Sequence, residues 1–215
     1  MAVNLRKGQG VSLRKDQNDL SKVTIGLGWD IAQAKSGGLL GSMFAKKEPD
    51  YDLDVVAFLC GSSGKVNDLG KTENGQPTLV NGDIVFYNSM QHHTGQVLLT
   101  GDNRTGVGDG DDEQIIANLN GLPDKYQKIA FVVQIYKGIE QKQNFGKVKN
   151  AFIRAVDRGG KEMARFDLSG GEGFANCRSM IFAELVREEG GWKFNAIGRP
   201  FETDSFVHIL RDHYI

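Results

Sequence analysis

The stretch Leu53-Asp-Val-Val-Ala-Phe-Leu-Cys60 has the length and the composition of a buried β-strand. Short runs rich in β-branched and aromatic side chains are typical of strands. Eight other runs share this character, and most are bounded by Gly, Asn or Asp: 23–29, 84–87, 113–119, 129–136, 151–156, 163–168, 178–187 and 192–197. Nine strand-like runs with few helical patterns between them predict an all-β fold, an antiparallel β-sandwich with short helices.

Glycine is frequent and proline is rare, which favours tight turns over disordered linkers. The chain has 28 glycines among 215 residues and only four prolines, whereas glycine averages about 7% of residues in proteins. The stretches Asp157-Arg-Gly-Gly160 and Glu188-Glu-Gly-Gly191 predict hairpin turns, because glycine readily adopts positive φ.

The clearest helical pattern is 203–213, near the C-terminus. Thr203 or Asp204 can cap its first turn. Side chains spaced i, i+3, i+4 and i+7 share one helix face, and here they are Phe206, Ile209, Leu210 and His213. A short helix at 138–144 is a weaker prediction.

Length and composition indicate one soluble domain. A chain of 215 residues suits a single domain of about 100–200 residues, so we expect one β-sandwich over 1–215 with the tail 201–215 packed on it. No run approaches the roughly 20 apolar residues of a membrane span, and residues 1–7 lack the apolar core of a signal peptide. We therefore expect a cytoplasmic protein, with Cys60 and Cys177 as buried free thiols.

The overall charge points to no polyanionic partner. Twenty-six basic and 27 acidic residues give a net charge of −1. Direct binding to nucleic acid is therefore not expected.

One segment departs from this balance: Gly101-Asp-Asn-Arg-Thr-Gly-Val-Gly-Asp-Gly-Asp-Asp-Glu113. It contains five carboxylates and a single base, Arg104. Such crowding is unfavourable unless a cation neutralises it, and interleaved glycines let backbone carbonyls turn inward beside the carboxylates. Oxygen donors in a flexible loop suit Ca²⁺, whereas zinc prefers His or Cys. The segment is not an EF-hand, because Arg104 stands where that loop needs an acidic ligand.

A second acidic group precedes and enters the stretch 53–60. Asp50, Asp52 and Asp54 alternate, so an extended chain would project them from one face. Asp30 and Asn88 follow two other strand-like runs. We expect all of these groups to converge with the acidic segment at one edge of the sandwich, where two Ca²⁺ ions could share ligands. The alternative is an acidic loop that is simply solvated.

Several motifs together resemble the TerD family of tellurium-resistance and stress proteins. The resemblance extends from Val3 to about Gly198 and rests above all on the acidic segment, starting at Thr100. The other motifs are Gly26-Leu-Gly-Trp-Asp30, Asp52-Leu-Asp54, Phe86-Tyr-Asn88, Asn144-Phe-Gly146, Ala151-Phe-Ile-Arg154 and Trp192-Lys-Phe194.

The resemblance implies a non-catalytic β-sandwich that binds Ca²⁺ at neighbouring sites. It also implies partners among other proteins of bacterial tellurium-resistance operons, and action at the inner face of the membrane. Thr105 and Gly106 would contribute backbone carbonyls. The other metal-site positions carried over from the family are Asp30, Asp52, Asp54, Asn88, Asp102, Asn103, Asp109, Asp111, Asp112 and Glu113.

Other interpretations remain open. A carboxylate-rich site could instead hydrolyse phosphate esters with Mg²⁺ or Mn²⁺, or a metal could bridge a nucleotide or another small molecule. His92 and His93 are expected to be exposed loop residues that cannot share a metal, since neighbours in a strand point to opposite faces. The range 33–49 is expected to be a surface loop with a docked apolar tip, or else a partner-binding tip.

Overall fold

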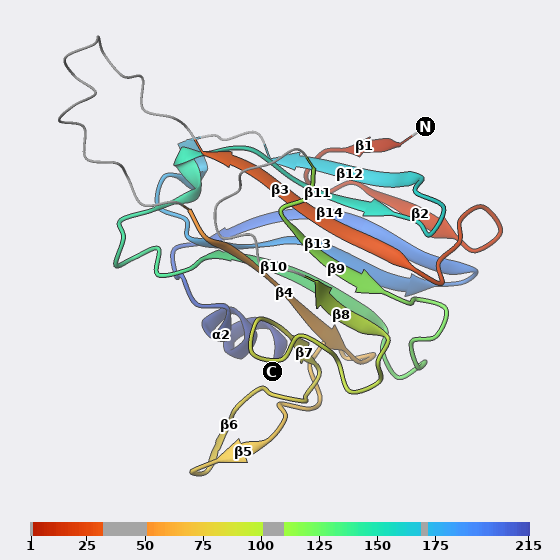
Figure 1. Cartoon of the computed structure of the whole chain (residues 1–215), viewed down its shortest axis with the longest axis horizontal. Coiled ribbons are helices and arrows are strands. Elements are labelled where there is room, and N and C mark those ends of the chain that lie inside the picture. Colours follow the sequence, from red (N-terminus) through yellow and green to blue (C-terminus); the bar gives the residue numbers. More distant parts are fainter. Residues whose placement is uncertain (1, 32–50, 101–109, 169–171) are drawn as a thin grey trace, which may run out of the picture.

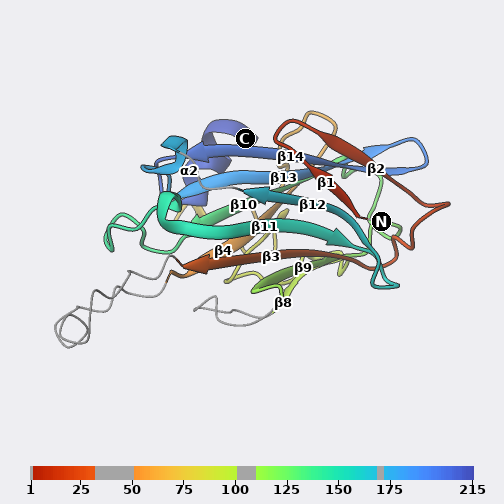
Figure 2. The ribbon, with the colours of Figure 1, turned by 90° about the horizontal axis from the view of Figure 1, so that it is seen from above.

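Two six-stranded sheets face each other as layers in this computed structural model, which describes residues 2–31, 51–100, 110–168 and 172–215 (Figures 1 and 2). We call them the first and the second sheet. The first sheet has the order β1 (Val3–Leu5), β12 (Glu162–Leu168), β11 (Val148–Val156), β3 (Val23–Ile31), β9 (Glu113–Ala117) and β8 (Val97–Thr100). The second has the order β2 (Gly10–Arg14), β14 (Gly191–Phe201), β13 (Ser179–Glu188), β10 (Lys128–Ile135), β4 (Leu53–Cys60) and β7 (Ile84–Val85).

The antiparallel sandwich expected from the sequence is confirmed. Neighbouring strands pair antiparallel, except that β1 runs parallel to β12. A small separate hairpin joins β5 (Thr72–Glu73) to β6 (Gln76–Pro77). The expected hairpin turns are present after β11 and β13, with positive φ at Gly160 and Gly190. Helices are few and short, including the 3₁₀ turns η1 (Phe145–Lys147) and η2 (Glu172–Phe174).

Strand β4 is buried at all eight positions because both of its faces are covered. Its odd-numbered residues, such as Val55 and Leu59, pack in the main core with residues of both sheets. Val56, Phe58 and Cys60 point the other way, into a second cluster with the C-terminal helix. Burial on two faces explains why this run is almost continuously apolar.

The C-terminal helix begins later than the sequence predicts. Helix α2 (Phe206–Ile209) continues as a π-helical turn, η3 (Leu210–Tyr214). The backbone carbonyl of Thr203 accepts a hydrogen bond from the Ser179 hydroxyl at 2.6 Å, which ties this part of the chain to β13. Asp204 accepts from the backbone N–H of Ile139 at 2.9 Å and does not cap the helix. The cap position is Ser205.

The helix face also differs at its end. Phe206, Ile209 and Leu210 are buried as expected, but Tyr214 replaces His213 as the last buried residue. A π-helical turn contains more residues than an α-helical turn, so it moves the apolar face along by one position.

The prediction of a short helix at 138–144 is wrong. This range forms consecutive turns, and Lys137 and Lys142 have φ of 52° and 57°. Positive φ at non-glycine residues is incompatible with a regular right-handed helix.

Both cysteines are buried and free, as expected. Burial raises the pKa of the Cys60 thiol to about 12. No helix among the described ranges combines the length and the apolar character needed to cross a bilayer.

We predict that Phe206 anchors the helix on β4. Phe206 is 4% exposed, and its ring centroid lies 6.2 Å from that of Phe58 in β4 and 5.3 Å from that of Phe86. Truncating a buried phenylalanine removes apolar contacts and leaves a cavity, so Phe206→Ala should lower the free energy of unfolding by about 3–5 kcal/mol in urea denaturation. Val207→Ala is the control, because Val207 is 44% exposed and should shift stability by less than about 0.5 kcal/mol. Equal effects of the two substitutions would contradict this role.

Candidate metal centre

The described end of the acidic segment, Gly110 to Glu113, lies against β3 as it enters β9. The backbone N–H of Asp112 donates to the carbonyl of Leu27 at 2.7 Å, and Glu113 pairs with the same residue in the strand register. Parts of the chain more than 80 residues apart are thus brought side by side. This contact brings the oxygen atoms of residues 110–113 close to β3.

Two glycines of β3 provide the space for this segment. A Cβ atom on Gly26 would overlap the carboxylate of Asp111. A Cβ atom on Gly28 would lie 2.9 Å from the carbonyl oxygen of Gly110 and would overlap the ring of Phe152. Glycine weakens a strand, and close approach of the acidic segment explains its presence at both positions.

Asp111 is held by an ion pair on this glycine surface. Its side chain is 2% exposed and accepts a hydrogen bond from Arg154 Nε at 2.8 Å. Its other oxygen accepts from Gln114 Nε2 at 3.2 Å. The hydrogen bond with Asp111 is the main cause that raises the pKa of Arg154, and Glu162 contributes through a 3.0 Å contact. The guanidinium therefore neutralises the Asp111 carboxylate.

Asp112 and Glu113 bind backbone N–H groups in different sheets. Asp112 Oδ2 accepts from the N–H of Trp29 in β3 at 2.9 Å. Glu113 is 3% exposed, and its Oε2 accepts from the N–H of Val55 in β4. Because β9 belongs to the first sheet and β4 to the second, the Glu113 carboxylate links the two layers. Hydrogen bonds to an ionised carboxylate are among the stronger ones in proteins.

The other predicted ligands are held by different neighbours. Asp30 is exposed in β3 and accepts a 2.7 Å hydrogen bond from Asn150 Nδ2. Asp52 directly precedes β4, and its carbonyl accepts from the N–H of Tyr136. Asp54 lies in β4, is 9% exposed and accepts from Gln134 Nε2 at 3.0 Å. Asn88 is exposed and lines a cavity of about 430 Å³ near β7.

The spacing along β3 limits which groups could share an ion. Asp111 lies over Gly26, and Asp30 is four residues farther along the same strand, which is about 13 Å in an extended chain. Calcium binds oxygen atoms at about 2.3–2.6 Å, so one ion cannot contact both Asp30 and Asp111. Asp102, Asn103, Thr105, Gly106 and Asp109 lie outside the described residues, as does the range 33–49.

The histidine pair lies in a loop as predicted, and His93 is exposed, but the predicted exposure of His92 and the opposite orientation of the two side chains are wrong. His92 is 1% exposed, and its ring centroid lies 4.1 Å from that of the exposed His93. These residues form a turn and not a regular strand, so both rings lie on one side. Together with Asp83 they place three potential metal ligands within 4.8 Å of one another, the only such group of three or more in the described part of the chain. The adjacent histidines were visible in the sequence, but the position of Asp83 beside them was not.

The sequence of the chain is similar to those of known proteins. The family model of the TerD domain matches residues 1–213. The chain belongs to the TerD family. The resemblance inferred from the sequence motifs is therefore confirmed.

Two relatives with wide coverage bear names of the same kind. Tellurium resistance protein TerX of Serratia marcescens is 66% identical over 213 residues, covering 99% of this chain and 100% of that protein. Stress response protein SCP2 of Bacillus subtilis is 36% identical and covers 98% of both chains. The crystal structure of a homologue of telluride resistance protein (TerD) from Streptomyces coelicolor matches with a TM-score of 0.61 and 20% identity, over 87% of this chain and 94% of that one. At this identity the likeness concerns the fold alone.

We predict that the TerD-family chain needs glycine at position 26. Gly26→Ala would force the Asp111 carboxylate and its Arg154 partner to move, which should cost about 1–3 kcal/mol of unfolding free energy, as overpacking typically does. Thermal and urea denaturation measure the change. Gly173→Ala is the control, since an added Cβ there meets nothing in the described chain within 4 Å. A Gly26→Ala protein as stable as the control would show that the acidic segment does not need this close approach.

Proposed function

We propose that this chain is a calcium-binding, non-catalytic protein of bacterial stress response and tellurite resistance, acting as a scaffold or a sensor. The observation that carries the proposal is the position of Asp111, Asp112 and Glu113. Their carboxylates contact β11, β3 and β4, at the point where a segment with five carboxylates enters the sandwich. Neutralising the charge of that segment would favour the native arrangement of these strands.

The chemistry of the donor atoms favours the binding of a hard cation. Every predicted ligand side chain of this centre offers oxygen, from carboxylate, amide or hydroxyl groups. Calcium takes six to eight oxygen ligands, whereas zinc prefers nitrogen and sulfur. A carboxylate has about four lone-pair positions on its two oxygens, so the backbone partners of Asp112 and Glu113 are compatible with coordination. Asp102, Asn103, Thr105, Gly106 and Asp109 would supply further oxygens.

The predicted ligands have different roles in this proposal. Asp112 and Glu113 would bind the ion and already hold β9 to β3 and β4. Asp111 would position the segment, because Arg154 and Gln114 each hold one of its oxygens. Asp30 lies too far from Asp111 to share its ion, so it would belong to a second position together with ligands from the 101–109 range. Asp52, Asp54 and Asn88 would complete the oxygen-rich set near β4 and β7.

Ion binding would contribute to stability, and the affinity would decide the biological role. A ligand that binds only the native state stabilises it by about 2.7 kcal/mol when its concentration is 100 times Kd. A micromolar Kd would make the order of the segment respond to intracellular calcium. A far lower Kd would make the ion a permanent structural element.

The cellular setting is the one that the resemblance in the sequence motifs implies. We propose that the chain acts in the cytoplasm, in complexes with other tellurium-resistance proteins at the inner membrane face. The two cysteines are buried and free, and neither has a cysteine neighbour in sequence with which to chelate or reduce tellurite. An indirect role is therefore proposed over direct detoxification chemistry.

Calcium titration of the metal-free full-length chain tests the proposal. We expect calorimetry to report about two bound ions per chain, and the melting temperature to rise with calcium concentration. Asp112→Asn should lose most of this rise, because the amide keeps an oxygen acceptor for the N–H of Trp29 but lacks the negative charge. Asp124→Asn is the matched control, since the Asp124 side chain is 97% exposed.

Two results would overturn the proposal. One is an unchanged melting temperature at millimolar calcium. The other is an equal calcium response in the Asp112→Asn and Asp124→Asn proteins, which would place the ligands elsewhere.

A further inference from the structure

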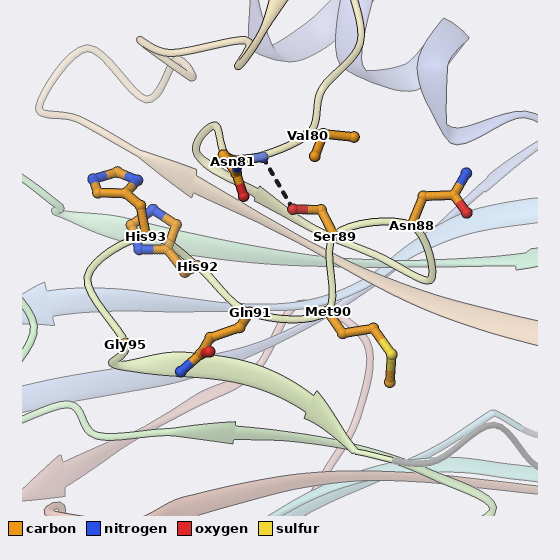
Figure 3. A pocket seen from close by; sticks show the side chains of 9 residues that line it. All are labelled: Val80, Asn81, Asn88, Ser89, Met90, Gln91, His92, His93 and Gly95. Atoms are coloured by element: carbon orange, nitrogen blue, oxygen red, sulfur yellow. Dashed lines mark hydrogen bonds between the residues drawn. The ribbon is translucent and has the colours of Figure 1, made fainter.

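A second group of potential metal ligands lies near β7, apart from the acidic segment. Asp83 directly precedes β7, and His92 and His93 belong to the connection between β7 and β8. Figure 3 shows the two imidazole rings one behind the other, on the same side of the loop. Tyr126, from the connection between β9 and β10, completes the group: its hydroxyl lies 2.6 Å from Asp83 Oδ1 and 3.4 Å from His93 Nε2.

A tight turn places the two histidines together. The N–H of Gly95 donates to the carbonyl of His92 at 2.8 Å, and Gly95 has φ of +71°. The N–H of His92 in turn donates to the carbonyl of Val97. In an extended strand the two side chains would point to opposite faces, so the shared orientation depends on this turn.

Thr94 defines the orientation of the His92 ring. The backbone nitrogen of Thr94 lies 3.3 Å from His92 Nδ1, and its N–H can only donate. The Thr94 hydroxyl lies 2.7 Å from the same ring nitrogen. Nδ1 is therefore an acceptor, and Nε2 faces Asp83 Oδ1 at 3.3 Å. A hydroxyl can also accept, so Thr94 can hold the other tautomer, in which Nε2 offers its lone pair to a metal. Metal-binding histidines commonly have such a partner on the second ring nitrogen.

Asp83 is a buried anion that lacks a strong countercharge. It is 1% exposed, and His92 is its only ion-pair partner within the described ranges. Its other partners are the Tyr126 hydroxyl and the backbone N–H of Asp68, which donate to its two carboxylate oxygens. A buried carboxylate is costly unless it is paired, and a divalent cation bound by Asp83 would supply a full countercharge.

The distance between the ligand atoms of Asp83 and His92 agrees with tetrahedral coordination. Zinc binds nitrogen and oxygen at about 2.0–2.2 Å, which places neighbouring ligand atoms of a tetrahedral site about 3.3–3.5 Å apart. The Asp83 Oδ1 to His92 Nε2 distance is 3.3 Å, and the ligand atoms of all three side chains lie within 4.8 Å of one another. Because His93 is exposed, water can reach a fourth position.

We propose that Asp83, His92 and His93 form a binding site for a divalent transition metal of the zinc type. Two imidazoles and one carboxylate favour Zn²⁺ and similar ions, whereas Ca²⁺ favours an all-oxygen set. The site therefore differs from the proposed calcium centre in metal preference. It lies apart from the acidic segment, although Asn88 lines the same cavity as the two histidines.

Zinc titration by calorimetry tests this site. The full-length chain is prepared without a polyhistidine tag and kept in saturating calcium throughout, so that the acidic segment does not respond. We expect one zinc ion per chain in the wild type. His93→Ala should weaken zinc binding at least about tenfold, and it should fold normally, because it leaves the hydrogen bonds among Asp83, His92 and Tyr126 in place.

His208→Ala is the matched control. His208 is also exposed and makes a hydrogen bond with Thr203, so its loss should leave zinc binding unchanged. Cobalt provides a second measurement: the wild type should give the visible absorption of tetrahedral Co²⁺, and His93→Ala should lose it. No zinc binding by the wild type, or equal affinities of the His93→Ala and His208→Ala proteins, would overturn the proposal.

Discussion

The hydrogen bond from the N–H of Val55 to the Glu113 carboxylate connects the two sheets at the place where the acidic segment enters the fold. Removing a carboxylate from water is costly unless donors surround it, and the N–H of Val55 is one donor to the buried Glu113 carboxylate. Asp112 binds the N–H of Trp29, and Asp111 pairs with Arg154. Three consecutive acidic residues are thus held by three different strands. The register of β9 against β3, and the position of β4 beside them, depend on the same carboxylates.

This constraint explains residues that would otherwise weaken the sheet. Glycine inside a strand costs about 0.5–1 kcal/mol relative to alanine, yet β3 contains Gly26 and Gly28 in its central part. Both lie beneath the acidic segment, where side chains would collide with Asp111 and the Gly110 carbonyl. The guanidinium of Arg154 comes from β11, the neighbouring strand on the other side of β3. The two glycines therefore lower the stability of β3 itself, but they allow Asp111 and Arg154 to pack closely on the outer surface of the first sheet.

The strands were largely predictable because burial fixes their composition, whereas contacts between distant residues were not. The run 53–60 matched β4 at both ends, since apolar side chains are needed on both of its faces. Four-residue β8 and three-residue β1 were missed because such short runs have no readable periodicity. The acidic segment was identified from composition, but its pairing with Arg154, 43 residues later, has no local signal. The helix began later than expected because Ser179 and Ile139 hold residues 203 and 204 in place.

The chemical difference between the two polar clusters follows from how each carboxylate is balanced. Asp111 already has a guanidinium within 2.8 Å, so its own charge gives it little further attraction for a cation. Asp83 is as deeply buried but meets only an imidazole, a phenol and a backbone N–H. None of these three partners is a guanidinium or an ammonium group, so among the described residues the Asp83 carboxylate has no permanently charged partner. Nitrogen donors beside that charge favour a borderline metal, while the oxygen donors beside β3 and β4 favour a hard one. The two proposed centres would therefore select different metals through donor type.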